Sequence, residues 1–386
     1  MGLNQKEIRI GMVGYQFMGK MHSHAYRDFP FYFDTDVLPV LQAISGRNEE
    51  SVKAAADKMG WATYETDWRR LIERDDIDVI DIVTPNHMHA EIAIAAAEAG
   101  KHIIIEKPLA MTVKQAESML EAVQKHHVIH MICHNYRFAP AVQYAKKLID
   151  EGRLGKLYHI RANYLQDFIV DPSFPLVWRL QKDVSGSGSL GDIGAHSIDL
   201  ARFLVGEFKE IVAMMETFIK ERPLAALQGG LSATADIEKL GTVTVDDAVA
   251  FLARFDNGVF GTFEATRFAQ GNRNKNKFEI NGEKGSIRWD MENMNNLEVY
   301  LANDEQGLQG FRLINCTEAS HPFAGAYWPA GHIIGYEHTF INLVHDFMQA
   351  IGNGTQPRPD FEDGVKNQRV LEAIEESALT KRWISL

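Results

Sequence analysis

The first third of the chain alternates short apolar runs with segments of helical character. Four apolar runs predict strands, and a predicted helix follows each of them. The strands are expected at 8–13, 40–45, 77–83 and 102–108, and the helices at 20–29, 49–59, 89–100 and 112–126. This alternation indicates an α/β fold with a parallel, doubly wound sheet, which binds ligands at the carboxyl ends of its strands.

The pattern changes near residue 134, where the alternation of strands and helices stops. Pairs of β-rich runs flank the turn residues at 256–258 and 281–282, which predicts two hairpins. Further elements are expected as a loop of small residues at 225–241, a strand at 296–302 and closing helices at 337–351 and 364–381. The second part of the chain is therefore expected to be α+β, with a largely antiparallel, open-faced sheet.

Composition and charge narrow the classes of function. A length of 386 residues suits two domains. The net charge is −12, and the sequence has no cluster of basic residues of the kind that binds nucleic-acid phosphates. No apolar stretch approaches the roughly 20 residues of a membrane helix, and the N-terminus lacks a signal-peptide pattern. Cys133 and Cys316 are far apart and suggest neither a disulfide framework nor a thiolate metal site. We expect a cytoplasmic protein with no nucleic-acid or membrane partner.

A glycine-containing turn follows the first predicted strand. Gly14 permits a tight turn and Gly19 a close approach of helix and strand, as in a dinucleotide fingerprint. Gln16 replaces the middle glycine of that fingerprint, so a looser approach to the phosphates is expected. The following helix offers its amides to a pyrophosphate. We therefore expect a Rossmann dinucleotide-binding domain over residues 1–133 and the α+β domain over residues 134–386.

The end of the second strand bears on the choice of cofactor. NAD sites often place Asp or Glu there, whereas this chain has Ser45, Gly46 and Arg47. An arginine can hold a 2′-phosphate, which favours NADP over NAD; alternatively, Arg47 covers the adenine or faces solvent. The residues expected to contact NAD(P) are Gly14, Gln16, Phe17, Met18, Ser45, Arg47, Thr84, Pro85, Asn86, His89, Glu106 and Lys107.

Three charged or titratable residues are candidates for proton chemistry. Lys107 directly follows an apolar strand, and Pro108 restricts its backbone, so its ammonium is held at the cofactor end of the sheet; alternatively, Lys107 is a surface lysine that begins a loop. Asp192 and His196 are four residues apart, on one face of a predicted helix. Histidine suits base work near neutrality, and a carboxylate orients it. Alternatively, Asp192 interacts with the helix dipole and His196 is a structural residue.

The glycine turn, EKP at 106–108 and DIGAH at 192–196 together resemble the Gfo/Idh/MocA oxidoreductase family. The segment 164–208 is most similar to its levoglucosan and inositol dehydrogenase branch. The resemblance implies that Lys107 hydrogen-bonds the reacting oxygen, that His196 acts as acid/base assisted by Asp192, and that a cis bond precedes Pro108. It also implies NAD(P)-dependent oxidation of a secondary hydroxyl of a sugar, anhydro-sugar or inositol. The second domain would bind the substrate and build a homodimer or homotetramer through its sheet.

Candidates for substrate contact combine aromatic surface with polar groups. They are Arg137, Tyr164, Gln166, Asp167, Trp178, Arg179 and Tyr336, and ordinary structural polarity explains each of them equally well. The histidine groups at 22–24, 87–89 and 126–130 lack carboxylates at metal-site spacing, so no metal is expected. We interpret the first two groups as loop residues and the third as a helix end.

Two other functions remain open. An NAD-dependent glycosidase of the same fold would use transient oxidation to eliminate a leaving group, with the same residues. A sensor would bind the dinucleotide without chemistry. Such relatives tend to lose the lysine or the histidine, whereas this chain keeps both Lys107 and His196.

Overall fold

The chain forms two compact units. A computed structural model describes residues 5–225 and 234–386. The first unit comprises Met1–Phe138 and Ile334–Gln368, and the second comprises Ala139–Ile333 and Arg369–Leu386. Residues 334–368 thus fold with the first unit, whereas the sequence placed them in a domain over 134–386.

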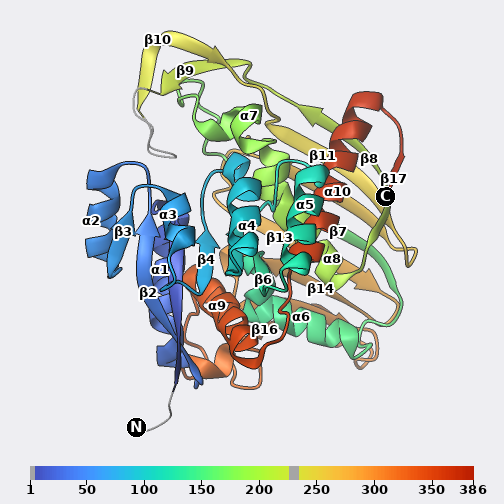
Figure 1. Cartoon of the computed structure of the whole chain (residues 1–386). Coiled ribbons are helices and arrows are strands. Elements are labelled where there is room, and N and C mark those ends of the chain that lie inside the picture. The colour runs from blue at the N-terminus through green and yellow to red at the C-terminus, as the bar shows by residue number, and fades with distance from the viewer. Residues whose placement is uncertain (1–4, 226–233) are drawn as a thin grey trace. The chain divides into compact units, whose positions relative to one another are not determined.

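A six-stranded parallel sheet forms the centre of the first unit, in the order β3-β2-β1-β4-β5-β6 (Figure 1). Its strands are β1 (Lys6–Val13), β2 (Val37–Ser45), β3 (Thr63–Glu65), β4 (Val79–Ile82), β5 (His102–Glu106) and β6 (His130–Cys133). Its helices are α1 (Phe17–Tyr32), α2 (Glu49–Met59), α3 (Trp68–Glu73), α4 (His89–Glu98), α5 (Val113–Lys125), α9 (Tyr336–Asn353) and the start of α10 (Phe361–Thr380). The predicted parallel, doubly wound sheet is confirmed.

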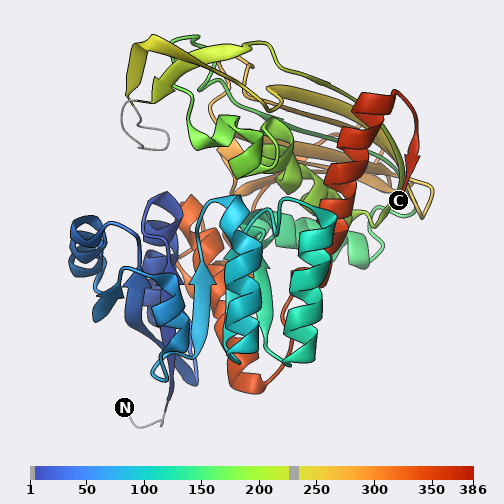
Figure 2. The same ribbon diagram turned by 45° about the horizontal axis from the view of Figure 1, so that its top comes forward.

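Helices pack on this sheet in neighbouring groups. Helices α3, α4 and α5 lie side by side (Figure 2), and α1 packs against α9. Apolar residues of β1, β4 and β5 form one core cluster with residues of α3, α4, α5 and the start of α10, including Ile80, Ile103 and Phe361. Strands buried by helices in this way are apolar along their length, which is why they are readable in the sequence.

Residues 334–368 join the first unit through specific polar contacts. Asn135 donates its side-chain amide to the Thr339 hydroxyl at 2.9 Å, and Asn342 donates to the Phe138 carbonyl at 2.9 Å. The amide of Ile132 in β6 donates to the Pro359 carbonyl at 3.0 Å. These contacts link positions about 200 residues apart in the chain, so no local pattern predicts them.

A nine-stranded mixed sheet forms the centre of the second unit, in the order β16-β15-β14-β13-β7-β12-β11-β8-β17. Its strands are β7 (Leu157–Leu165), β8 (Phe208–Glu216), β11 (Ala248–Phe255), β12 (Phe260–Thr266), β13 (Lys275–Gly282), β14 (Gly285–Asp290), β15 (Asn296–Leu301), β16 (Arg312–Asn315) and β17 (Ile384–Ser385). Strands β9 (Glu221–Ala225) and β10 (Ala235–Thr242) form a separate pair, and the helices are α6 (Pro140–Asp150), α7 (Lys182–Ser185) and α8 (Ala195–Leu204).

The predicted hairpins and the largely antiparallel sheet are confirmed, and one detail differs from the expectation. Strands β11 and β12 flank the turn at 256–258, and β13 and β14 flank the turn after 281–282. Strands β7 and β12 pair in parallel, whereas every other pair of this sheet is antiparallel among the residues described. The loop expected at 225–241 is partly wrong, since Ala235–Thr242 forms β10; residues 226–233 lie outside the described residues.

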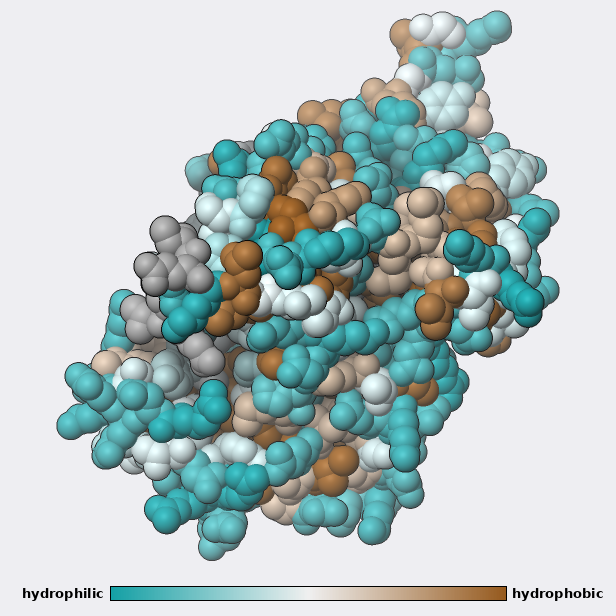
Figure 3. Space-filling view, turned by 90° about the horizontal axis from the view of Figure 1, so that it is seen from above, coloured by the Kyte–Doolittle hydropathy of each residue, from teal (hydrophilic) through white to brown (hydrophobic). Residues whose placement is uncertain are grey.

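The two faces of the nine-stranded sheet differ in character. One face carries the buried side chains of Phe251, Phe263 and Phe278. Met214 and Leu252 lie on the opposite face and are 70% and 41% exposed. On the side of the molecule drawn in Figure 3, hydrophobic residues occur in small groups among hydrophilic ones. Among the described helices, none is both long and apolar enough to cross a membrane.

Candidate active site

The turn after β1 has the geometry of a dinucleotide-binding loop. Gly14 has a φ of +111°, and a Cβ there would lie 2.8 Å from the Val83 carbonyl oxygen, so a side chain does not fit. A Cβ on Gly19 would lie 2.7 Å from the Gly14 carbonyl oxygen, which confirms the close approach of helix and strand. The N-terminus of α1 is open to an anion, because among the residues described Gln16 makes no capping hydrogen bond and the first turn holds no acidic residue.

Neighbouring strand ends complete this edge of the sheet. Ser45 is buried, and its carbonyl accepts a hydrogen bond from the Gly14 amide at 3.0 Å. The Tyr15 ring lies so close to Gly46 that a Cβ there would be 2.0 Å from a ring carbon, so the glycine turn covers the end of β2. Arg47 follows and is exposed. The sequence did not identify Tyr15 as a residue of this edge.

His89, expected to contact the cofactor, occupies a buried structural position. Its Nδ1 lies 2.9 Å from the Pro108 carbonyl oxygen and its Nε2 lies 3.1 Å from the Thr84 carbonyl oxygen. Burial lowers the pKa of His89, and the hydrogen bonds to the Thr84 and Pro108 carbonyls oppose that shift. His89 thus joins the loop after β4 to the loop after β5.

Lys107 lies directly after β5, at the carboxyl edge of the sheet. Its backbone amide donates to Glu106 Oε2 at 3.1 Å, and the Lys107–Pro108 bond is cis, as the resemblance implied. Glu106 is itself buried and meets the ring of His22. The interpretation of residues 22–24 as a loop is wrong, because they lie within α1.

In the second unit, a buried carboxylate holds the turn before α8. Asp246 accepts hydrogen bonds from the Gly188 amide at 2.7 Å, the Ser189 hydroxyl at 2.5 Å and the Leu190 amide at 2.8 Å. The turn at residues 188–190 is therefore held at several points. The sequence did not single out Asp246, although two aspartates directly before an apolar strand were a usable signal.

Asp192 forms ion pairs with two arginines. It lies in a π-helical turn over Leu190–Gly194, which precedes α8, so the spacing to His196 is not that of a regular α-helix. Its Oδ2 lies 2.5 Å from Arg267 Nη2 and 3.8 Å from Arg179 Nε. Burial lowers the pKa of Arg179, and the charge of Asp192 opposes that effect. Arg267 is completely buried and was missed in the sequence, where nothing distinguishes it from other arginines at strand ends.

His196 lies beside a group of polar side chains on β7 and the segment after β12. Its ring is 6.0 Å from that of Tyr164, measured between centroids. The Tyr164 hydroxyl donates to Asn274 Oδ1 at 2.6 Å, and the Gln166 side-chain amide donates to the same oxygen at 2.9 Å. The structure therefore brings Tyr164, Gln166 and His196 into one group, together with Asn274.

The remaining candidates are distributed over both units. In the second unit, Asp167 accepts from the Gly271 amide at 3.1 Å, and Trp178 and Arg179 belong to one 3-10 turn. In the first unit, Arg137 is buried with a nitrogen 3.7 Å from Asp363, and Tyr336 begins α9. The first unit thus holds Lys107 and the dinucleotide loop, and the second holds Asp192 and His196.

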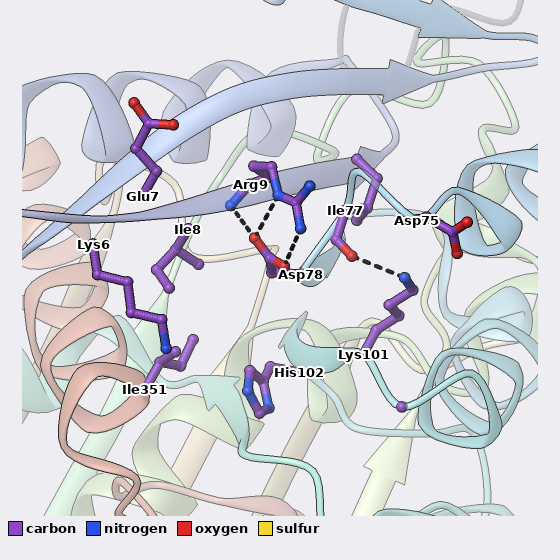
Figure 4. A pocket seen from close by; sticks show the side chains of 11 residues that line it. Lys6, Glu7, Ile8, Arg9, Asp75, Ile77, Asp78, Lys101, His102 and Ile351 are labelled. Carbon is purple, nitrogen blue, oxygen red and sulfur yellow. Dashed lines mark hydrogen bonds and ion pairs between the residues drawn. The ribbon is translucent and has the colours of Figure 1, made fainter.

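A pocket of about 630 Å³ in the first unit lies away from this edge (Figure 4). Its lining comes largely from the amino ends of β1 and β5, the edge opposite Lys107. Within it, Arg9 Nη2 lies 2.7 Å from Asp78 Oδ1, and Lys101 Nζ donates to the Ile77 carbonyl at 2.8 Å. This pocket is not the candidate site, because ligands of a parallel sheet bind at the carboxyl ends of its strands.

We expect Arg267→Met to weaken both stability and activity. The change leaves the Asp192 carboxylate without its nearest cation, so the free energy of unfolding should fall by about 1–3 kcal/mol in urea titrations. Arg273→Met is the matched control, because Arg273 also pairs with an aspartate, Asp167, but its side chain is 85% exposed. This variant should change the free energy of unfolding by less than about 0.5 kcal/mol. Equal losses in both variants would contradict a special role of the buried arginine.

Comparisons with known proteins agree with this geometry. Residues 8–134 match the oxidoreductase family with an NAD-binding Rossmann fold, and residues 142–288 match the GFO/IDH/MocA C-terminal domain. The chain is 45% identical to levoglucosan dehydrogenase of Pseudarthrobacter phenanthrenivorans, covering 99% of this chain and 98% of the relative. It is 27% identical to myo-inositol 2-dehydrogenase of Thermotoga maritima, covering 98% of each.

Solved structures give the same result. A levoglucosan dehydrogenase in complex with NADH and levoglucosan is 44% identical, with a TM-score of 0.94 over 99% of each chain. An oxidoreductase domain protein from Kribbella flavida is 48% identical, with a TM-score of 0.93 over 98% of this chain and 99% of that one. Family matches over both halves and full-length identity above 40% lead to one conclusion: the chain is an NAD-binding oxidoreductase that belongs to the GFO/IDH/MocA family.

Proposed function

We propose that this oxidoreductase removes a hydride from a secondary alcohol carbon of a sugar, anhydro-sugar or inositol. The observation that carries the proposal is the position of Lys107 at the carboxyl edge of the parallel sheet, directly after β5 and in the same unit as the Gly14 turn. A cation held there can stabilise the oxygen of a reacting alcohol. Anhydro-sugars are the first substrate class to test, because a relative 45% identical over the full chain is a levoglucosan dehydrogenase.

The residues of the first unit suit a bound dinucleotide. The uncapped start of α1 supplies amides to a pyrophosphate, and Gly14 leaves space where a side chain would clash. Bound nicotinamide would supply the hydride acceptor. Thr84, Pro85 and Asn86 follow β4 at the same edge, where we propose that they contact the cofactor together with Phe17 and Met18.

Proton and hydride leave the substrate separately in this proposal. The C–H bond breaks with its electron pair to give the hydride, and the O–H proton passes to the imidazole of His196, which leaves a carbonyl group. Lys107 donates a hydrogen bond to that oxygen as negative charge develops. Asp192 assists by binding and orienting the substrate. Its ion pairs with Arg267 and Arg179 hold its carboxylate in place.

The second unit offers a surface suited to a polyhydroxylated ring. Tyr164 and Gln166 converge on Asn274 next to His196, and Trp178 adds an aromatic ring nearby in the sequence. Aromatic faces pack on the C–H side of sugars, while amides and carboxylates bind hydroxyls. We propose that these residues, with Asp167 and Arg179, bind the substrate, and that Arg137 and Tyr336 are further substrate contacts.

We expect Lys107→Ala to lower turnover strongly while the protein still binds NADH. Loss of one charge-stabilising donor costs about 10²- to 10³-fold in kcat. Lys114→Ala is the control, because Lys114 is an exposed lysine on the following helix and should leave kcat unchanged within about twofold. The assay follows absorbance of the reduced nicotinamide with levoglucosan, other anhydro-sugars, glucose, and myo- and scyllo-inositol.

Each outcome of this assay separates the functions considered. Turnover by Lys107→Ala at the wild-type rate would overturn the proposed mechanism. Release of nitrophenol from an aryl glycoside without net reduction of NAD⁺ would identify a glycosidase. Tight NADH binding with no turnover on any substrate would identify a sensor.

We propose that NAD⁺ is the working cofactor. Arg47 favours NADP in the sequence, whereas the levoglucosan dehydrogenase complexes, 44% identical, contain NADH. Arg47 is exposed at the end of β2, where it can cover an adenine as well as hold a phosphate. Arg47→Ser should therefore change kcat/KM for NAD⁺ by less than about threefold. If the wild type prefers NADP⁺ and Arg47→Ser lowers kcat/KM for NADP⁺ by tenfold or more, Arg47 binds the 2′-phosphate instead.

The open face of the nine-stranded sheet is proposed to bind a second copy of the chain. Met214, Leu252 and Phe260 are exposed there, at 70%, 41% and 41%, among charged side chains such as Arg161. Burial of these apolar groups would favour a homodimer or homotetramer. Light scattering should report two or four copies, and Leu252→Glu should lower that number. A monomeric wild-type protein at micromolar concentration would contradict the proposal.

A further inference from the structure

A histidine buried beneath the proposed catalytic lysine bridges two carboxylates. His22 lies in α1 and is completely buried. Its Nδ1 lies 3.0 Å and 2.9 Å from the two oxygens of Asp81 on β4, and its Nε2 lies 3.1 Å from Glu106 Oε1 at the end of β5. All three residues belong to the first unit, and the ring of Phe340 lies 5.5 Å from the imidazole, measured between centroids.

The arrangement calls for a charged imidazole. A neutral ring has one N–H, whereas here both ring nitrogens face carboxylate oxygens, and two donors are present only in the imidazolium. Burial lowers the pKa of His22, whereas Asp81 and Cys133 raise it through charge and hydrogen bonding, and the result lies well above the ordinary value. Because burial raises the pKa of Cys133 to about 12 and raises that of Tyr26 well above its usual range, the charge assigned to His22 rests on the two carboxylates that face its nitrogens.

The bridge continues to the backbone of Lys107. Glu106 Oε1 faces His22, while its Oε2 accepts the Lys107 amide at 3.1 Å. On the other side, His22 is part of the helix that begins directly after the Gly14 turn. One line of hydrogen bonds therefore connects α1 to the residue that carries the proposed catalytic ammonium.

We propose that His22 is a positioning residue, which holds Glu106 so that Glu106 in turn orients Lys107 relative to the dinucleotide turn. The proposal rests on the function proposed above for Lys107. His22 itself touches neither substrate nor nicotinamide in this role. His22 affects the reaction only by contacting the Glu106 carboxylate. Activity therefore depends on that contact, and a polar group at position 22 that does not reach Glu106 is not sufficient.

Two substitutions separate this role from simple core stability. Asparagine places its amide near the position of Nδ1, and glutamine places it near that of Nε2. His22→Asn therefore keeps a group facing Asp81 and loses the contact with Glu106, whereas His22→Gln keeps the contact with Glu106. Both remove the same buried charge, so they form a matched pair.

We expect the two variants to differ in kcat but not in substrate or cofactor binding. His22→Gln should retain kcat within about threefold, and His22→Asn should lower kcat by at least about tenfold, with KM for the alcohol and Kd for NADH within about threefold of wild type in both. Equal kcat values in two folded variants would show that His22 is only structural. Turnover by Lys107→Ala at the wild-type rate would instead overturn the proposed function, so the two failures are distinguishable.

If neither variant folds, the wild-type protein with NADH bound provides the test. The NMR spectrum of ¹⁵N-labelled histidine should show one buried ring protonated on both nitrogens throughout the neutral range. A ring without a proton on Nε2, the nitrogen that faces Glu106, would overturn the proposal. Metal analysis belongs to the same experiment, because His22, Glu106 and Cys133 place donor atoms within 4.8 Å of one another. A stoichiometric metal ion would replace the hydrogen-bonded bridge and overturn the proposal as well.

The pH dependence of stability gives an independent readout. A raised pKa means that the folded protein holds a proton that the unfolded chain releases above about pH 6.5. The stabilisation from His22 is therefore fully present below that pH and is lost as pH rises through the folded pKa. The difference in unfolding free energy between the wild type and His22→Asn should shrink as pH rises above about 6.5. A difference that grows with pH would contradict a charged His22.

Discussion

A buried charge must be paired, and this requirement organises the carboxyl edge of the first unit. Asp81 and Glu106 lie on adjacent buried strands, β4 and β5, where unpaired carboxylates would be strongly destabilising. His22 meets both of them from α1. The helix that begins at the dinucleotide turn is thereby tied to the strand that ends at Lys107, so the two parts of the proposed site are joined by charge as well as by packing.

The second unit meets the same requirement with a different set of residues. Arg267 is completely buried and pairs with Asp192, while Asp246 binds the backbone of the segment before α8. The π-helical turn that carries Asp192 is held from both sides by these contacts. Buried ionic groups therefore hold a residue of the proposed site in each unit: His22 acts on Lys107 through Glu106, and Arg267 pairs directly with Asp192.

The sequence was informative wherever the structural cause is local. Buried parallel strands are apolar along their length, glycine is required where φ is positive, and turn residues such as Asn257 and Gly258 join adjacent strands. For that reason four strands of the parallel sheet, the Gly14 turn and the β11–β12 hairpin were predictable. Lys107 stood out on similar grounds, because a cation after an apolar strand and before proline is unusual.

The sequence by itself thus determined four strands and the helices after them in the first unit, the two hairpins of the second, the family and the residues proposed for chemistry. Only the tertiary structure decided what surrounds those residues. The return of 334–368 to the first unit, the parallel pairing of β7 with β12, and the partners His22–Glu106 and Arg267–Asp192 all join positions far apart in the chain. Such partners depend on which strands and helices become neighbours in space, and a period of two or 3.6 residues carries no information about that choice.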